Sequence, residues 1–126
     1  MTNTVLSFMI GKTPASVEEV NNNYQSEIHF KFSDGTSVVF THEQDCCEDV
    51  KIEDINGDLS DLVGVPLLVA EERMSYGDGE YYHYTWTFYT FRSIKGSVDI
   101  RWIGSSNGYY SEWVDILYYS EEGELV

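Results

Sequence analysis

The sequence predicts a mainly β protein, built as one curled antiparallel sheet or a small sandwich with one or two short helices. Three observations support this fold class. Apolar and polar residues alternate with a period of two in several short segments, as in strands with one buried face. Aromatic residues make up 15% of the chain and include ten tyrosines, and aromatic residues are enriched in strands. Gly, Asn and Asp recur between the alternating segments, where turns need them.

The first half of the chain predicts a hairpin and short strands. Residues 27–32 alternate, residues 33–35 (Ser-Asp-Gly) predict a turn, and residues 36–41 predict the returning strand. Further strands are predicted over residues 50–53, which end before Asn56-Gly57, and over the apolar residues 67–70.

Two places predict short helices. Residues 58–62 fit one helical turn, with Asp58 as the N-cap and Gly64 closing it. The other is the segment 13–23, with Ser16 as a cap for residues 17–21.

The second half predicts longer strands over residues 84–91 and 97–103, with residues 76–82 as a mobile hairpin tip. Asn107-Gly108 is a strong signal for a type I′ hairpin leading into residues 109–119. The alternation places these side chains in one core: Ile28, Phe30, Phe32, Val50, Ile52, Trp86, Phe88, Val98, Ile100 and Trp102.

Charge is the most informative feature for function. Twenty-two Asp and Glu face seven Lys and Arg, a formal charge of −15 in 126 residues. Such a surplus excludes nonspecific binding to nucleic acid or to an anionic membrane, and it favours a basic partner or a cation. Lys51 is the only base within the densest acidic segment, whose acids are Glu43, Asp45, Glu48, Asp49, Glu53, Asp54, Asp58 and Asp61.

No motif in the chain predicts a metal site or an enzyme. Cys46 and Cys47 are adjacent, so their side chains point to opposite faces of an extended chain, unlike the spaced cysteines of zinc sites. We expect no zinc, no bridge between them, one cysteine in the core and the other at the surface. Residues 54–58 resemble the start of a calcium loop, but Leu59 and Val65 occupy positions that need Gly and Glu.

Catalysis is equally unsupported. The three histidines lie far apart, and no serine has a nucleophile-elbow context. We therefore expect no enzyme, no catalytic residues and no cofactor. Residues 104–111 read mainly as a turn, but Asn107, Tyr109 and Tyr110 could instead form a recognition loop.

The length fits one domain over residues 1–126, with a core over about 4–119 and an acidic C-terminal tail over 120–126. No apolar run reaches the roughly 18 residues that span a bilayer. No basic region precedes the apolar residues 5–10, and the cysteines cannot form an extracellular disulfide framework. We expect a cytoplasmic protein, and the oligomeric state stays open.

Several motifs together resemble a small uncharacterised domain family that is common among phage and prophage proteins. They are Asp-Gly-Thr in the first hairpin turn, His-Glu-Gln-Asp-Cys-Cys-Glu, Ile-Glu-Asp-Ile-Asn-Gly-Asp-Leu, Thr-Trp-Thr-Phe-Tyr and Gly-Ser-Ser-Asn-Gly-Tyr-Tyr-Ser-Glu. The resemblance covers residues 24–115. It implies a viral origin and a single β-rich domain, and it brings no established activity.

The favoured hypothesis is an inhibitor of a host defence protein that handles nucleic acid, such as a nuclease. It would act in the host cytoplasm through an acidic surface that mimics DNA or blocks access. The partner would be a basic host protein, without direct contact to nucleic acid or membrane. The predicted partner-binding residues are the acids named above with Asn107, Tyr109 and Tyr110. Two alternatives are a structural module of a virion or its assembly, and a module that binds a small ligand or a cation.

Overall fold

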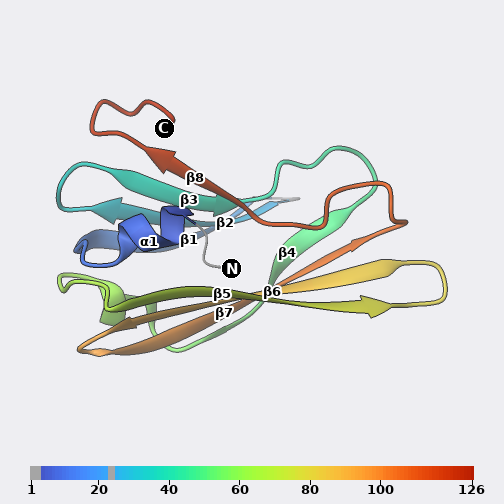
Figure 1. Ribbon diagram of the computed structural model, residues 1–126, viewed down its shortest axis with the longest axis horizontal. Coiled ribbons are helices and arrows are strands. Elements are labelled where there is room, and N and C mark those ends of the chain that lie inside the picture. The colour runs from blue at the N-terminus through green and yellow to red at the C-terminus, as the bar shows by residue number, and fades with distance from the viewer. Residues whose placement is uncertain (1–3, 23–24) are drawn as a thin grey trace.

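A computed structural model describes residues 4–22 and 25–126 and contains two four-stranded antiparallel sheets that form two layers (Figure 1). One sheet has the order β1-β2-β3-β8, with strands Pro14–Asn22, Gln25–Phe32, Ser37–Thr41 and Asp115–Tyr119. The other has the order β4-β7-β6-β5, with strands Asp49–Asn56, Gly96–Ser106, His83–Ser93 and Val69–Asp78. The predicted mainly β fold class is confirmed.

The hydrophobic core lies between the two sheets. The ring centroids of Phe30 and Phe91 are 5.0 Å apart, and those of Phe40 and Tyr89 are 4.8 Å apart, so the layers contact each other through aromatic rings. Most side chains that the alternation places in the core are buried there: Ile28, Phe30, Phe32, Val50, Val98, Ile100 and Trp102.

Strand β6 departs from the predicted core. Trp86 and Phe88 are half-buried on the outer face of their sheet, whereas Thr85, Thr87, Tyr89 and Phe91 point inward and are buried. Ile52 is only partly buried. The inward prediction for Trp86 and Phe88 is wrong because every residue from 84 to 91 is apolar, aromatic or carries a hydroxyl, so polarity does not mark the buried face there.

The segment predicted as a helix over residues 13–23 is instead strand β1 as far as Asn22, and residue 23 lies outside the described residues. Its register places Val17 opposite Phe30 of β2. Hydrogen-bonded pairing with β2 thus makes this segment a strand, although the spacing of its Val residues also fits a helix. The helical turn predicted after Asp58 is confirmed as the 3-10 helix η1, Leu59–Leu62, and Asp58 accepts a hydrogen bond of 3.0 Å from the backbone N–H of Ser60. Gly64 follows it with φ of +82°.

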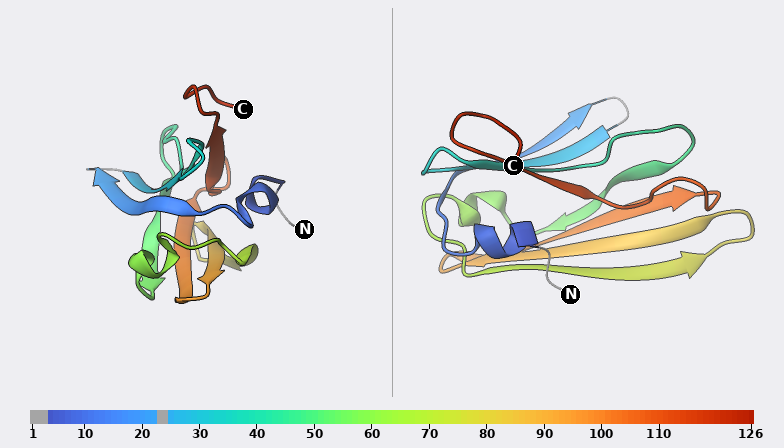
Figure 2. Two further views of the ribbon diagram at one scale, coloured as in Figure 1. Left: turned by 90° about the vertical axis from the view of Figure 1, so that its left-hand side faces the viewer. Right: turned by 45° about the horizontal axis from the view of Figure 1, so that its top comes forward.

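The sequence did not predict helix α1, Thr4–Met9. Its Leu6 and Met9 are fully buried, and it contacts both β5 and β8. Figure 2 (left) shows it on the side of the sandwich where these two edge strands face each other. Neither helix in the described part of the chain has the length and apolar character to cross a bilayer.

The chain crosses between the layers by two loops that lead from one sheet to the other. Residues 42–48 connect β3 to β4, and residues 107–114 connect β7 to β8. The hairpin predicted at Asn107-Gly108 is therefore wrong, because β8 pairs with β3 in the opposite sheet. Gly108 has φ of +96°, but no described residue other than glycine has a positive φ, so Asn107 cannot complete a type I′ turn.

Candidate functional site: an acidic and aromatic end

The two crossing loops and the tip of the β5–β6 hairpin lie at the same end of the molecule. The register aligns Asp49 with Ser105, Ser105 with Tyr84, and Tyr84 with Gly77 across the second sheet. Neighbouring strands are about 4.8 Å apart, so this row is about 14 Å wide. We call residues 42–49, 78–83 and 107–113 the loop end. These segments contain no Lys or Arg.

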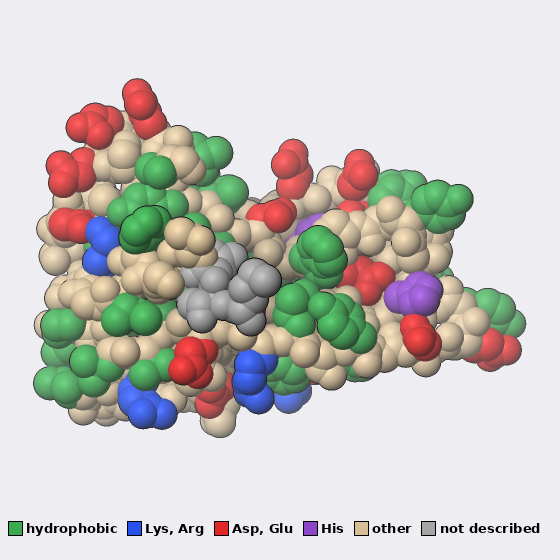
Figure 3. Space-filling view, viewed as in Figure 1, with side chains coloured by type: hydrophobic (Ala, Val, Ile, Leu, Met, Phe, Trp, Pro, Cys, Tyr) green, Lys and Arg blue, Asp and Glu red, His purple; other side chains and the backbone are tan. Residues whose placement is uncertain are grey.

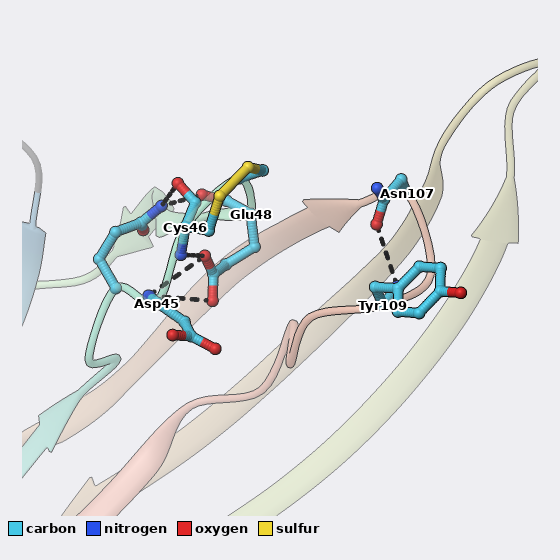
Figure 4. Close-up of a disulfide and its surroundings, with 7 residues drawn as sticks. Asp45, Cys46, Glu48, Asn107 and Tyr109 are labelled. Carbon is cyan, nitrogen blue, oxygen red and sulfur yellow. Dashed lines mark hydrogen bonds between the residues drawn. A yellow bond between two sulfur atoms is a disulfide. The ribbon is translucent and has the colours of Figure 1, made fainter.

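Glu48 organises the first crossing loop from beneath. It is 3% exposed, and its carboxylate accepts hydrogen bonds from the backbone N–H of Cys46 at 2.9 Å and of Asp45 at 3.3 Å. Figure 4 shows this carboxylate facing the two N–H groups. The side-chain amide of Gln44 donates to the backbone oxygens of Glu48 and Cys46. A short irregular segment is thereby fixed in one conformation.

His42 connects this loop to the second one. The ring is 4% exposed, with Nδ1 at 2.8 Å from the backbone oxygen of Trp113 and Nε2 at 3.2 Å from the Glu48 carboxylate. The ring therefore bridges the backbone of the second loop and the buried carboxylate of the first. Burial acts to raise the pKa of Glu48, but hydrogen bonds from the Cys46 backbone and from His42 outweigh it and hold the pKa below its ordinary 4.5.

Glu112 fixes the second crossing loop. It is 8% exposed, and it accepts hydrogen bonds from the hydroxyls of Thr85, at 2.9 Å, and of Ser106. Its backbone lies so close to β7 that a Cβ at Gly104 would stand 2.3 Å from the Glu112 carbonyl oxygen. The loop is therefore held against β6 and β7 of the second sheet, and only glycine fits at position 104.

The structure corrects the prediction for the cysteines. The sulfur atoms of Cys46 and Cys47 are joined in a disulfide, and both residues are exposed on the first loop. Neither lies in the core, because the hydrogen bonds from the backbone of Asp45 and Cys46 to the buried Glu48 carboxylate turn this loop outward. Among the described residues no group of three or more His, Cys, Asp and Glu is placed to hold a metal ion.

Exposed aromatic side chains cover the loop end. Tyr109 is 90% exposed, Tyr81 78%, Trp113 58% and Tyr82 52%. The carboxylates of Asp78 and Glu80 lie beside them, and Asp78 accepts from His83 at 2.7 Å. Figure 3 shows acidic and hydrophobic side chains interspersed at this end, while Lys and Arg gather elsewhere on the same face.

Part of the predicted acidic surface lies at the loop end. Glu43, Asp45 and Asp49 are exposed there, and Asp49 pairs with Lys51 at 3.4 Å. Glu48 is turned inward and offers no exposed carboxylate.

The other predicted acids lie farther away. Glu53 of β4 forms an ion pair of 2.6 Å with Arg101 of β7, and Asp54 is exposed on β4. Asp58 and Asp61 belong to the η1 turn, beyond the far end of β4. That strand has 8 residues and rises about 3.3 Å per residue, so its ends are about 23 Å apart. The predicted acidic face is therefore divided between two ends of the molecule.

Only part of the predicted recognition loop presents side chains to solvent for binding. The Asn107 side chain accepts a hydrogen bond of 3.0 Å from the backbone N–H of Tyr109, so it stabilises its own turn. Tyr109 projects into solvent, and Tyr110 is half-buried. Sequence reasoning does not find Glu112 and Trp113, because the Asn-Gly pair before them predicts a hairpin. It assigns no role to Tyr81 and Tyr82 either, although it places them in a hairpin tip.

Residues 7–116 match the family described as "Domain of unknown function (DUF7448)". The chain belongs to this family. The expected relation to an uncharacterised domain family is thereby confirmed. No curated protein and no solved structure matches the chain. Membership of the family brings no activity with it, so the loop end is the basis for a functional conclusion.

Proposed function

We propose that this protein is a non-enzymatic binding protein whose loop end engages a basic surface of a partner protein. In its most specific form, the proposal is an inhibitor of a host defence protein that handles nucleic acid. One observation carries it: the exposed carboxylates of Glu43, Asp45 and Glu80 lie among exposed aromatic rings, on loops without a single Lys or Arg.

Each chemical component suits a basic protein surface. Carboxylates form charge-assisted hydrogen bonds with Arg and Lys. Tyr and Trp add contact area, and their ring faces attract the same cations. Burial of Glu48 and Glu112 under the loops supports the proposal further, because a surface that is already ordered loses less conformational entropy on binding.

The choice of a nucleic-acid-handling partner follows from charge. Duplex DNA carries about one negative charge per 1.7 Å, so proteins that hold it are basic. An acidic competitor is steered to such a surface by long-range attraction. The resemblance of the motifs to phage domains supports a host defence protein as the target, and such a protein would be met in the host cytoplasm.

Two matched triple reversals test the proposal. The first, Glu43→Lys, Asp45→Lys and Glu80→Lys, changes the loop end. The second, Glu121→Lys, Glu122→Lys and Glu124→Lys, changes the exposed C-terminal turn, which Figure 1 shows at the opposite end. Both change the net charge equally. The partner is recovered from host lysate, identified by mass spectrometry and purified, and its affinity for each variant is measured at low and high salt.

The loop-end variant should bind at least about 100-fold more weakly at low salt, whereas the C-terminal variant should lose about tenfold or less, since charges are screened beyond about 8 Å at physiological ionic strength. A short DNA duplex should compete with the wild-type protein for the partner. Equal losses in both variants would show that only net charge matters and would refute recognition by the loop end. Calcium binding lost in the loop-end variant, without any protein partner, would favour a cation module instead.

A further inference from the structure

A groove of about 380 Å³ opens between strand β5 and the start of β8. Six residues line it: Glu72, Met74, Tyr76, Thr87, Trp113 and Val114. Three come from β5, one from β6, and two from the end of the second crossing loop. The groove is therefore continuous with the loop end but faces the side of the sandwich.

The groove exists because the two sheets leave this side uncovered. The register of β5 places Glu72, Met74 and Tyr76 on the inner face, opposite Tyr89, Thr87 and Thr85. Met74 is nevertheless 37% exposed and Tyr76 67% exposed. Helix α1 contacts β5, and just after the helix the Gly11 N–H donates to the carbonyl of Leu67, two residues before β5 begins. Figure 1 shows β5 continuing well past the helix.

Helix α1 shows what this side of the molecule accepts. It lies between β5 and β8 and buries Leu6 and Met9 completely, and its Phe8 ring meets the Tyr118 ring edge-on with centroids 6.0 Å apart. The same gap between the edge strands thus holds apolar side chains at one end and is open at the other.

Thr87 supplies the polar feature of the groove. It is 2% exposed, and its hydroxyl has no hydrogen-bond partner among the described residues. A buried hydroxyl without a partner lowers the stability of the folded protein. A ligand group that reaches this hydroxyl would remove that penalty.

The groove is also negatively charged. Glu72 accepts a hydrogen bond of 2.7 Å from the Tyr89 hydroxyl. Burial, followed by the negative charge of Glu72, raises the pKa of Tyr89, and Glu72 itself lines the groove. The one base of β5, Arg73, lies on the outer face, 5.4 Å above the Phe88 ring.

From these contacts we infer that the groove binds an extended segment of the partner in which an apolar side chain is flanked by Lys or Arg. The apolar side chain contacts Met74, Tyr76 and Trp113, a backbone group reaches Thr87, and a flanking cation pairs with Glu72. This inference rests on the proposed function, since it identifies the element of a basic partner that the molecule holds.

Short synthetic peptides test the groove without knowledge of the partner. The five residues from Glu72 to Tyr76 extend over about 13 Å, so peptides of about seven residues are long enough. The probe has Leu at its centre and Lys on both sides. One control peptide has Gly at the centre, and another has Glu in place of Lys. Binding is followed by two-dimensional NMR of the labelled protein, which also reports that each variant is folded.

The Leu–Lys peptide should shift the signals of Met74, Thr87 and Val114, and both control peptides should bind at least about tenfold more weakly. Met74→Ala and Thr87→Val should each weaken binding about threefold to tenfold. Tyr109→Ala, at the loop end, should leave the affinity for the peptide unchanged and weaken only the binding of the purified partner.

Shifts confined to the loop end, equal binding of all three peptides, or no binding at millimolar peptide would overturn the inference. Self-association of the protein that is abolished by Met74→Ala would also overturn it, because the occupant would then be a second copy. The two proposals fail separately. If the loop-end reversal weakens partner binding but Met74→Ala and Thr87→Val do not, the groove proposal alone fails. If the peptide binds the groove but the loop-end reversal leaves partner binding unchanged, the proposed function fails.

Discussion

Replacing Glu48 with Gln tests whether one buried carboxylate orders the first crossing loop. Three donors converge on it: the backbone N–H groups of Asp45 and Cys46 and the ring of His42. A Gln amide has one acceptor oxygen and turns an NH₂ group toward the remaining donors. At least one N–H then lacks an acceptor, at about 1–3 kcal/mol, and the buried ring of His42 loses a carboxylate partner. We expect the free energy of unfolding to fall by about 1–3 kcal/mol at about pH 7.

The pH dependence separates this explanation from a simple packing defect. The pKa of Glu48 is lower in the folded protein than its ordinary 4.5. Its stabilising effect is therefore fully present above that value and disappears as the pH falls through the lowered pKa. In urea titrations, the difference between wild type and Glu48→Gln should be largest near neutral pH and should shrink toward about pH 3.

The matched control is Glu43→Gln, which removes an exposed carboxylate from the same loop and should change stability by about 0.5 kcal/mol or less. A loss below about 1 kcal/mol for Glu48→Gln, or a loss that stays constant between neutral and acid pH, would refute the account of the carboxylate as the charged centre of the loop.

Three further predictions concern the scaffold. Trp102→Ala should lower the free energy of unfolding by about 3–5 kcal/mol because Trp102 is 1% exposed, whereas Trp86→Ala, on the outer face, should cost about 1 kcal/mol. Asp58→Ala should lower the free energy of unfolding, because η1 loses its N-cap. Glu53→Gln with Asp54→Asn should promote self-association in sedimentation velocity, because charges on an edge strand oppose pairing with another chain. Equal losses of stability at the two tryptophans in urea denaturation would contradict the first prediction. Unchanged stability without the Asp58 cap would contradict the second, and a strictly monomeric β4 variant would contradict the third.

The sequence predicts the strands well where one face is polar and the other apolar. Strands β2 and β7 follow this rule, and their buried residues are correctly predicted. In strand β6, neither face is clearly polar over residues 84–91, so the sequence does not show which set of alternate residues is buried. Contacts with the opposite sheet place Thr87 rather than Phe88 inside. In β1, Val17 and Val20 have helical spacing, and only pairing with β2 makes the segment extended.

The candidate site is harder to predict because its geometry comes from distant segments. Nothing local distinguishes Glu48, which is buried, from Glu43, which is exposed. The difference arises when His42 meets the backbone of Trp113, a residue 71 positions away. Glu112 is likewise buried only because Thr85 and Ser106 meet in neighbouring strands. A run of acids therefore predicts that a charged surface exists, but which members face solvent is a property of the crossing loops.

The distribution of acids over the strands narrows what the net charge of −15 can mean. The outermost strands β1, β4, β5 and β8 carry most of the acids within strands: Glu18, Glu19, Asp49, Glu53, Asp54, Glu71, Glu72, Asp78 and Asp115. The four inner strands carry only Glu27 and Asp99. Charged edges prevent a sheet from pairing with another sheet, so the fold itself gives a reason for many of these carboxylates. This reason does not apply to the acids of the crossing loops and the hairpin tip, because these acids do not lie on an edge strand. Functional selection is therefore best sought there, where the carboxylates stand among exposed aromatic rings, rather than along β4, where the sequence alone placed the acidic face.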